Sequence, residues 1–318
     1  MKKILFGFLV VFAFACASKS DVEKEIEKIP MDVEIIRFDK EFGKAKVSDL
    51  SEIKRRFPEF FPKQYHDSIW VQKMQDTLQQ QLFEEVLKKF PSEENLEHNL
   101  EKLFQHIEYY FPQFKTPLVI TTTSDVDYRD KIILANNLLI IKLDTYLGSD
   151  HFFYQEIAKY VVKDMKESQI IPDIASVYAQ KYLPKIQSRT FLAQMIYYGR
   201  VLYLKDLWLP ETPDSEKIGY SEDQIIWAED NETEIWRNFV ENEFLFSTNP
   251  KLSSRFINPA PFSKFYLEID NQSPGMIGRY MGWQIVKSFM KNNNNNLEQL
   301  LTLSEEEIFN KSKYKPKK

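Results

Sequence analysis

The sequence predicts an α+β protein: a predominantly helical body with a small antiparallel sheet early in the chain. Short β-branched segments typical of strands lie only in the first half, at residues 33–38, 117–123 and 131–143. Apolar residues at three-to-four spacing predict helices over 57–110 and from 152 almost to the end. Strands and helices do not alternate regularly, which separates this class from doubly wound α/β folds.

The third of these segments predicts a β-hairpin. Two apolar runs, 132–134 and 138–141, flank the pair Asn136 and Asn137. Asparagine tolerates the positive φ angles that a tight two-residue turn requires. We therefore expect the two runs to pair in antiparallel orientation.

Residues 190–204 predict a helix that is apolar on almost every face, which is typical of a buried helix. Gly199 lies within it, although glycine in a helix interior costs about 1 kcal/mol relative to alanine. Gly275, Gly278 and Gly282 recur at i, i+3 and i+7 in a later segment. These glycines either let another backbone approach closely, which we favour, or belong to a functional turn or phosphate-binding loop.

Composition excludes several classes of function. The chain has 318 residues and a net charge of −5, which argues against nucleic acid as a partner. Its 8 glycines disfavour glycine-rich nucleotide loops. A single cysteine permits no internal disulfide and no thiolate zinc site, so stability must come from the core. We expect no cofactor.

The N-terminus has the pattern of a lipoprotein signal. Lys2 and Lys3 precede an apolar run over 4–15, which is too short to span a bilayer, and Cys16 follows directly. We predict cleavage of a signal peptide over 1–15, lipidation of Cys16, a flexible tether over 16–30 and one globular domain over 31–318. An ordinary signal peptide, with an accidental cysteine, is the alternative.

The residues do not specify a reaction. The four histidines are scattered, none at the i,i+4 spacing of a zinc-binding helix, and the sequence has neither a nucleophile elbow nor a Walker loop. A carboxylate pair such as Asp144 with Glu156 is neither excluded nor favoured, because 47 acidic residues always offer some pair.

Several segments together carry a resemblance to a known family. They are DTYLG at 144–148, IYYG at 196–199, LKD at 204–206, LP at 209–210, MGWQIV at 281–286 and SKYKP at 312–316. In order and spacing these segments resemble the gliding-motility lipoprotein GldB family of gliding Bacteroidetes, over most of the mature chain.

The resemblance implies a lipid-anchored protein of the cell envelope, facing the periplasm from a membrane that the sequence does not identify. It implies a requirement in gliding, alongside other motility lipoproteins and the type IX secretion machinery as partners. It does not imply a molecular activity.

A second similarity, to zincin-like metallopeptidases, concerns the scaffold. It implies an edge strand over 138–147 and a first helix over 172–181, with Tyr198 in place of the third metal ligand. Ser176, Val177 and Gln180 would stand where the zinc-binding helix has its two histidines and its glutamate. These residue types supply neither zinc ligands nor a base for a bound water.

The sequence therefore predicts a noncatalytic envelope protein that binds partners or supports an assembly, with an envelope peptidase or glycan hydrolase as the alternative. A cleft or interaction site is expected at six residues: Asp144, Tyr146, Tyr198, Gly199, Gly282 and Trp283. Tyr146 with the aromatic residues at 152–154 is the candidate lining of such a cleft, and the alternative is that these aromatics belong to the core, as such residues more often do.

Overall fold

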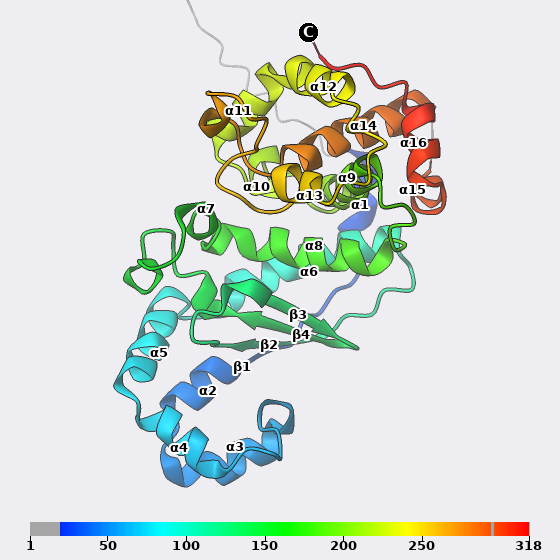
Figure 1. Cartoon of the computed structure of the whole chain (residues 1–318). Helices are drawn as coiled ribbons and strands as arrows, with labels where there is room; N and C mark the ends of the chain where they lie inside the picture. Colours follow the sequence, from blue (N-terminus) through cyan, green and yellow to red (C-terminus); the bar gives the residue numbers. More distant parts are fainter. Residues whose placement is uncertain (1–19, 294–295, 318) are drawn as a thin grey trace, which may run out of the picture.

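A four-stranded sheet lies between two groups of helices, with a further helical region beyond one of them (Figure 1). The computed structural model describes residues 20–293 and 296–317. The predicted α+β class is confirmed. The strands are β1 (Ile35–Arg37), β2 (Leu118–Thr122), β3 (Ile132–Ala135) and β4 (Leu138–Lys142). The helices are α1 (Asp21–Ile26), α2 (Phe38–Lys44), α3 (Leu50–Arg56), α4 (Asp67–Gln75), α5 (Thr77–Lys89), α6 (Glu94–Tyr110), α7 (Lys159–Val162), α8 (Ile170–Tyr182), α9 (Phe191–Trp208), α10 (Asp214–Ile218), α11 (Glu222–Asp230), α12 (Glu232–Glu241), α13 (Lys251–Phe256), α14 (Ile277–Asn293), α15 (Leu297–Thr302) and α16 (Glu305–Ser312).

The sheet is mixed, so the prediction of an antiparallel sheet is wrong in two of its three pairings. The strand order is β1-β2-β4-β3; β1 pairs parallel with β2, β2 parallel with β4, and only β3 with β4 antiparallel. Five helices, α2 to α6, connect β1 to β2. A helical crossover of this kind returns the chain in its original direction, which produces a parallel pair.

The predicted hairpin is confirmed. Ile132 pairs with Ile141 and Ala135 with Leu138, and Asn136 occupies the turn with a φ of 53°. β4 lies between β2 and β3, so it is not the edge strand that the zincin-like comparison requires.

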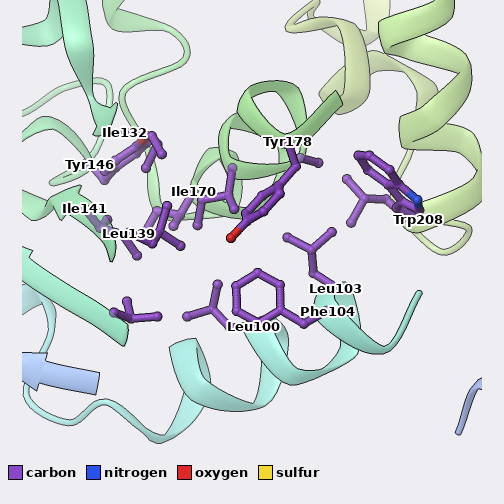
Figure 2. Packing of buried hydrophobic residues seen from close by; sticks show 14 of the residues in the cluster. Leu100, Leu103, Phe104, Ile132, Leu139, Ile141, Tyr146, Ile170, Tyr178 and Trp208 are labelled. Atoms are coloured by element: carbon purple, nitrogen blue, oxygen red, sulfur yellow. The ribbon is translucent and has the colours of Figure 1, made fainter. Parts of the chain in front are cut away.

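Neighbouring residues of β2 face opposite layers, as strand geometry demands. Val119 belongs to a core formed with α6, α8 and the end of α9, whereas Ile120 belongs to a separate phenylalanine-rich core under α2 to α5. In the first core, Leu100 and Phe104 of α6 approach Tyr178 of α8 (Figure 2). The sheet is therefore covered on both faces.

Helix α9 joins two cores, which explains why its sequence is apolar on almost every face. Leu204 and Trp208, near its end, pack in the core above the sheet. Phe191 and Met195, near its start, pack with α12, α13 and α14 in a second, entirely helical core. The prediction of a buried helix from residue 190 is confirmed, with Thr190 as its N-cap.

The N-terminal segment corrects one prediction. Residues 20–30, part of the expected flexible tether, include helix α1, whose Ile26 is buried. Glu23 of α1 contacts the imidazole of His106 on α6 at 3.2 Å, so the segment is docked on the body. Cys16 and the predicted signal peptide lie outside the described residues. In the described part of the chain, no helix combines the length and apolar character needed to span a membrane.

Candidate functional site

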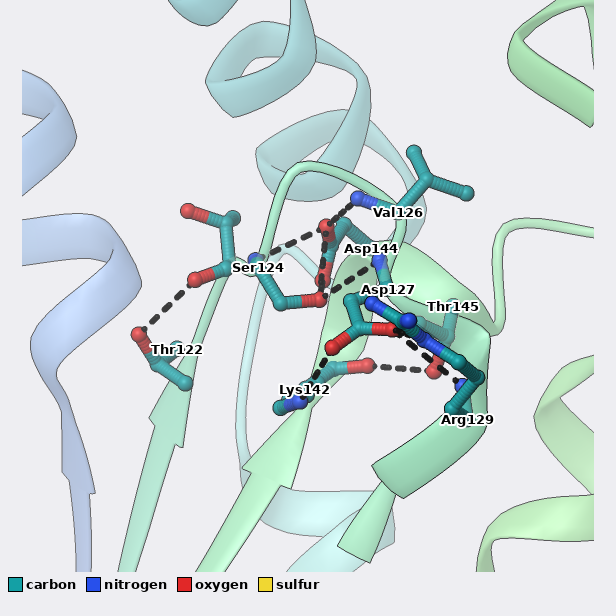
Figure 3. Close-up of polar contacts among 9 residues, drawn as sticks. Thr122, Ser124, Val126, Asp127, Arg129, Lys142, Asp144 and Thr145 are labelled. Atoms are coloured by element: carbon teal, nitrogen blue, oxygen red, sulfur yellow. Dashed lines mark hydrogen bonds and ion pairs between the residues drawn. The ribbon is translucent and has the colours of Figure 1, made fainter. Parts of the chain in front are cut away.

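Asp144, a predicted cleft residue, is fully buried and holds a loop (Figure 3). Its carboxylate accepts hydrogen bonds from the backbone N–H of Ser124 at 2.9 Å and of Val126 at 2.7 Å, and from the Ser124 hydroxyl at 3.2 Å. Asp125 and Val126 have positive φ angles of 59° and 60°. A β-branched residue rarely adopts this conformation, so the carboxylate fixes a strained turn.

Burial raises the pKa of Asp144, although the bonds from Ser124 and Val126 oppose the shift. Glu156, by contrast, is exposed. The two residues therefore share no accessible cleft, and the open alternative of a carboxylate pair finds no support. Asp144 has a structural role.

Tyr146 is also fully buried, and Tyr154 is nearly so, so both belong to the core, which is the alternative that the sequence leaves open for them. Among residues 152–154, Phe152 is exposed. The Tyr146 hydroxyl donates to Asp173 of α8 at 2.9 Å, and Lys131 contacts the same carboxylate at 2.5 Å. Burial raises the pKa of Tyr146 well above its usual value. The hydrogen bond from the buried Tyr146 therefore holds the Asp173 carboxylate in place.

Gly199 and Gly282 form the crossing between α9 and α14. A Cβ on Gly199 would lie 2.3 Å from the carbonyl oxygen of Gly282, and a Cβ on Gly282 would lie 1.8 Å from the carbonyl oxygen of Met195. Only glycine permits this approach. The close-packing interpretation is confirmed for both, and the crossing sets the positions of side chains one turn away.

Trp283 is fully buried beside this crossing, so it lines no cleft. Its indole N–H donates to Asp206 at 2.7 Å, and the Lys287 ammonium lies 3.6 Å from the centre of its ring. Asp206 also contacts Lys217 at 3.0 Å. This network ties α14 to α9 and α10.

A cavity of about 240 Å³ lies where α8, α9, α10 and the start of α14 meet; we call it the α8–α9 pocket. Tyr198 is the one predicted site residue that lines it. The Arg279 guanidinium lies 4.1 Å from the centre of the Tyr198 ring, and its Nε donates to the carbonyl oxygen of Ile257 at 2.7 Å. Arg279 precedes Gly282 by about one turn, so the glycine crossing brings Arg279 to Tyr198.

Lys205 is the most buried cation of the α8–α9 pocket, with 5% of its surface exposed. Its ammonium donates to the carbonyl oxygen of Lys217 at 2.6 Å. Burial is the main cause that lowers the pKa of Lys205, to about 8; Asp173 and Asp164 oppose the shift, whereas Arg279 and Lys131 add to it. Among residues 20–293 and 296–317, no carboxylate lies within ion-pair distance of Lys205 or Arg279.

A larger groove of about 820 Å³ lies between α1, α6 and the ends of α8 and α9. Its charges are largely paired within the chain: Glu23 with His106 at 3.2 Å and Lys89 with Glu167 at 2.9 Å. The smaller pocket is therefore the stronger candidate site, because two of its cations, Lys205 and Arg279, have no acidic partner among the described residues.

The zincin-like positions converge only in part. Ser176 of α8 and Tyr198 of α9 both line the α8–α9 pocket. Gln180 is exposed and Val177 packs against the core, so neither joins them. The Ser176 hydroxyl donates to the carbonyl oxygen of Pro172 at 3.0 Å.

The sequence analysis missed Lys205, Arg279, Asp173 and Lys131. A signal existed for Lys205, because a lysine that continues an apolar helix is seldom buried without a reason. For Asp173 and Lys131 no local pattern existed, since strand β3 and helix α8 bring them together from positions far apart in the sequence.

Comparison with models of known protein families shows which family the chain belongs to. The model of the family described as "Gliding motility protein GldB" matches residues 19–316, nearly the whole chain. The chain belongs to the GldB family. The resemblance found in the sequence is thereby confirmed.

Neither the curated proteins nor the solved structures contain a significant match to the chain. Membership of the GldB family makes this a gliding-motility-related protein of the cell envelope. The α8–α9 pocket, the glycine crossing and the Asp144 loop all lie within the part that the GldB model matches.

Proposed function

We propose that this GldB-family chain is a noncatalytic binding component of the gliding apparatus, anchored by a lipid on Cys16 and facing the periplasm. It holds envelope partners of the motility or type IX secretion systems, and its α8–α9 pocket receives a segment of such a partner. The observation that carries this proposal is the pair of pocket cations, Lys205 and Arg279, with no acid of the described chain within ion-pair distance of either.

The other polar groups of the pocket also favour binding over turnover. The Tyr220 hydroxyl donates to the carbonyl oxygen of Gly275 at 2.6 Å, and Asp173 is engaged by Tyr146 and Lys131. Groups fixed by such bonds form a preorganised surface, which lowers the entropy cost of holding a ligand.

The first test is genetic. In-frame deletion of the gene should abolish single-cell gliding and colony spreading, and the wild-type chain should restore both. Deletion cells that glide normally would refute the motility role itself.

The second test blocks the pocket without changing its charge. Ser176→Phe would place a ring in the cavity, whereas Ser254→Phe places one on the exposed face of α13. The two serines are matched, because each donates to a carbonyl oxygen of its own helix, at 3.0 and 2.9 Å. We expect only the Ser254 variant to restore gliding at equal protein level. Normal gliding of the Ser176→Phe strain would contradict a role for the pocket.

One observation favours the alternative of an envelope hydrolase. A lysine with a pKa of about 8 is suited to act as a general base near neutral pH. Turnover of casein or peptidoglycan fragments by the purified wild-type chain, abolished in Lys205→Met, would establish that alternative. Asp144→Asn is not informative here, because Asp144 is buried away from any cavity opening.

A further inference from the structure

We propose that the α8–α9 pocket recognises a carboxylate, carried by the C-terminus of a peptide or by a small free acid, and that Lys205 and Arg279 bind it. This inference rests on the proposed binding role of the pocket and adds the chemical class of the ligand.

The positive charges around the cavity are only partly paired with acids of the chain. Lys131 is paired with Asp173 at 2.5 Å and Lys163 with Asp164 at 3.2 Å. Lys217 is neutralised from outside the cavity by Asp206 and Asp214, at 3.0 and 3.1 Å. After these pairs, the positive charges of Lys205 and Arg279 remain. Burying a cation without a counter-charge costs free energy, because the cation loses its hydration. An anionic ligand in the cavity would offset that cost by supplying the counter-charge.

The two cations also supply hydrogen-bond donors. An ammonium has three N–H donors, and the structure shows one of those of Lys205 bonded to the carbonyl oxygen of Lys217. The guanidinium of Arg279 is bonded through Nε to Ile257, which leaves the N–H groups of its two terminal nitrogens. A planar fork of this kind matches the two oxygens of a carboxylate. Stacking on Tyr198 fixes the plane of that fork.

The size of the cavity and the shape of the Arg279 fork favour a carboxylate. Asp164 and Asp173 also line the cavity, each paired with a lysine, so the positive charge that remains belongs to Lys205 and Arg279. The fork of Arg279 matches the two oxygens of a planar carboxylate. A volume of about 240 Å³ fits a peptide end or a small acid. We therefore favour a carboxylate as the ligand group.

The binding has a predictable pH dependence. The charged groups that shift the pKa of Lys205 are Asp173 of α8, Arg279 of α14, Lys131 just before β3, and Asp164 of the loop before α8. Lys163 and Lys217 line the same cavity and are paired with acids. Because the pKa of Lys205 is lowered to about 8, the free chain loses this positive charge above that pH. The affinity for a carboxylate should then fall by up to about tenfold per pH unit above pH 8.

The experiment uses the full chain purified in detergent and isothermal titration calorimetry. The probes are acetyl-Gly-Gly-Ala with a free C-terminus, the same peptide with a C-terminal amide, acetate and inorganic phosphate. We expect the free-acid peptide to bind and the amide not to bind. Binding of acetate as tight as that of the peptide would identify a small acid as the source, and weaker binding would identify a peptide end.

Variants assign the binding to the pocket. Lys205→Met and Arg279→Lys should each weaken the binding of the free-acid peptide at least about tenfold, because each removes charge or the two-pronged geometry. Lys291→Met, on the exposed face of α14, should bind like wild type. Thermal unfolding verifies that each variant is folded. If Lys205→Met does not fold, the binding measured with Arg279→Lys still tests the proposal.

Three results would overturn the proposal: equal binding of acid and amide, tighter binding of phosphate than of acetate, or no binding of either carboxylate. Each is distinguishable from failure of the proposed function. Suppose that the Ser176→Phe strain does not glide, although the free-acid and amide peptides bind equally. The proposed role of the pocket in gliding then stands, and only the proposal of a carboxylate ligand is refuted. If that strain glides normally although the free acid binds, the ligand class stands and the role in gliding falls.

Discussion

Asp144 and Lys205 are both buried charged residues, but the chain treats them differently. Burial favours the neutral form of each side chain, so it raises the pKa of Asp144 and lowers the pKa of Lys205. Around Asp144 the fold supplies two backbone N–H groups and a hydroxyl, whereas Lys205 has one carbonyl oxygen and, among the described residues, no acid within ion-pair distance. A charge satisfied from within the chain stabilises a local structure. A charge left without a counter-charge at a cavity is the observation behind our proposal that a binding partner supplies it.

The largest effect is expected from the crossing that positions the pocket. In Gly282→Ala the new methyl would lie 1.8 Å from the carbonyl oxygen of Met195, so α9 and α14 must separate. We predict a loss of more than about 4 kcal/mol in the free energy of unfolding, or no folding at all. Denaturant unfolding measures it, with Lys291→Ala on the exposed face of α14 as control. A loss below about 1 kcal/mol would show that α9 and α14 can move apart at little cost in stability.

The second effect tests the satisfied charge. Asp144→Ala leaves the N–H groups of Ser124 and Val126 without their acceptor. Orphaned buried donors cost about 1–3 kcal/mol each, so we predict a loss of about 3 kcal/mol in the free energy of unfolding. Asp150→Ala, at an exposed acid, should leave the stability unchanged. If the Asp144 variant is as stable as wild type, the carboxylate does not hold the loop.

The third effect has the opposite sign and sharpens the contrast. Lys205→Met removes the uncompensated charge and keeps the length of the side chain. We predict a gain of about 1–2 kcal/mol in the free energy of unfolding at pH 7, because apolar replacement of a poorly compensated buried charge is often stabilising. A loss comparable with that of Asp144→Ala would mean that the fold itself depends on Lys205.

The smallest effect is the pH dependence of that gain. The pKa of Lys205 in the folded chain is about 8, below the ordinary value of 10.5 that it regains on unfolding. Between these values the unfolded chain binds more protons, so the contribution of Lys205 to the stability rises with pH. The advantage of Lys205→Met should therefore disappear by about pH 10. An advantage that stays constant from pH 7 to pH 10 would contradict the lowered pKa.

Local patterns predicted the elements better than their pairing. The hairpin at Asn136 and the buried helix from Thr190 follow from turn chemistry and apolar periodicity within a few residues. The parallel pairing of β1 with β2 depends on a crossover of five helices, which no local pattern encodes. The tether was mispredicted because four of the six residues at 21–26 are charged, yet Ile26 is buried against the body.

Of the six predicted site residues, Tyr198 lines the candidate site. Gly199 and Gly282 were recognised as points of close approach, and Tyr198, next to the first of them, lines the α8–α9 pocket. Lys205 and Arg279 come from two helices, and only the tertiary structure shows that neither has an acidic partner in the part of the chain that the structure describes. Charge compensation is a property of the assembled fold.

The most direct test of this account is gliding of deletion cells that carry the Lys205→Met chain, at a protein level equal to wild type. The account predicts that these cells do not glide, although the variant folds at least as stably as the wild-type chain. Normal gliding would contradict it, because the buried charge would then serve neither the fold nor the function.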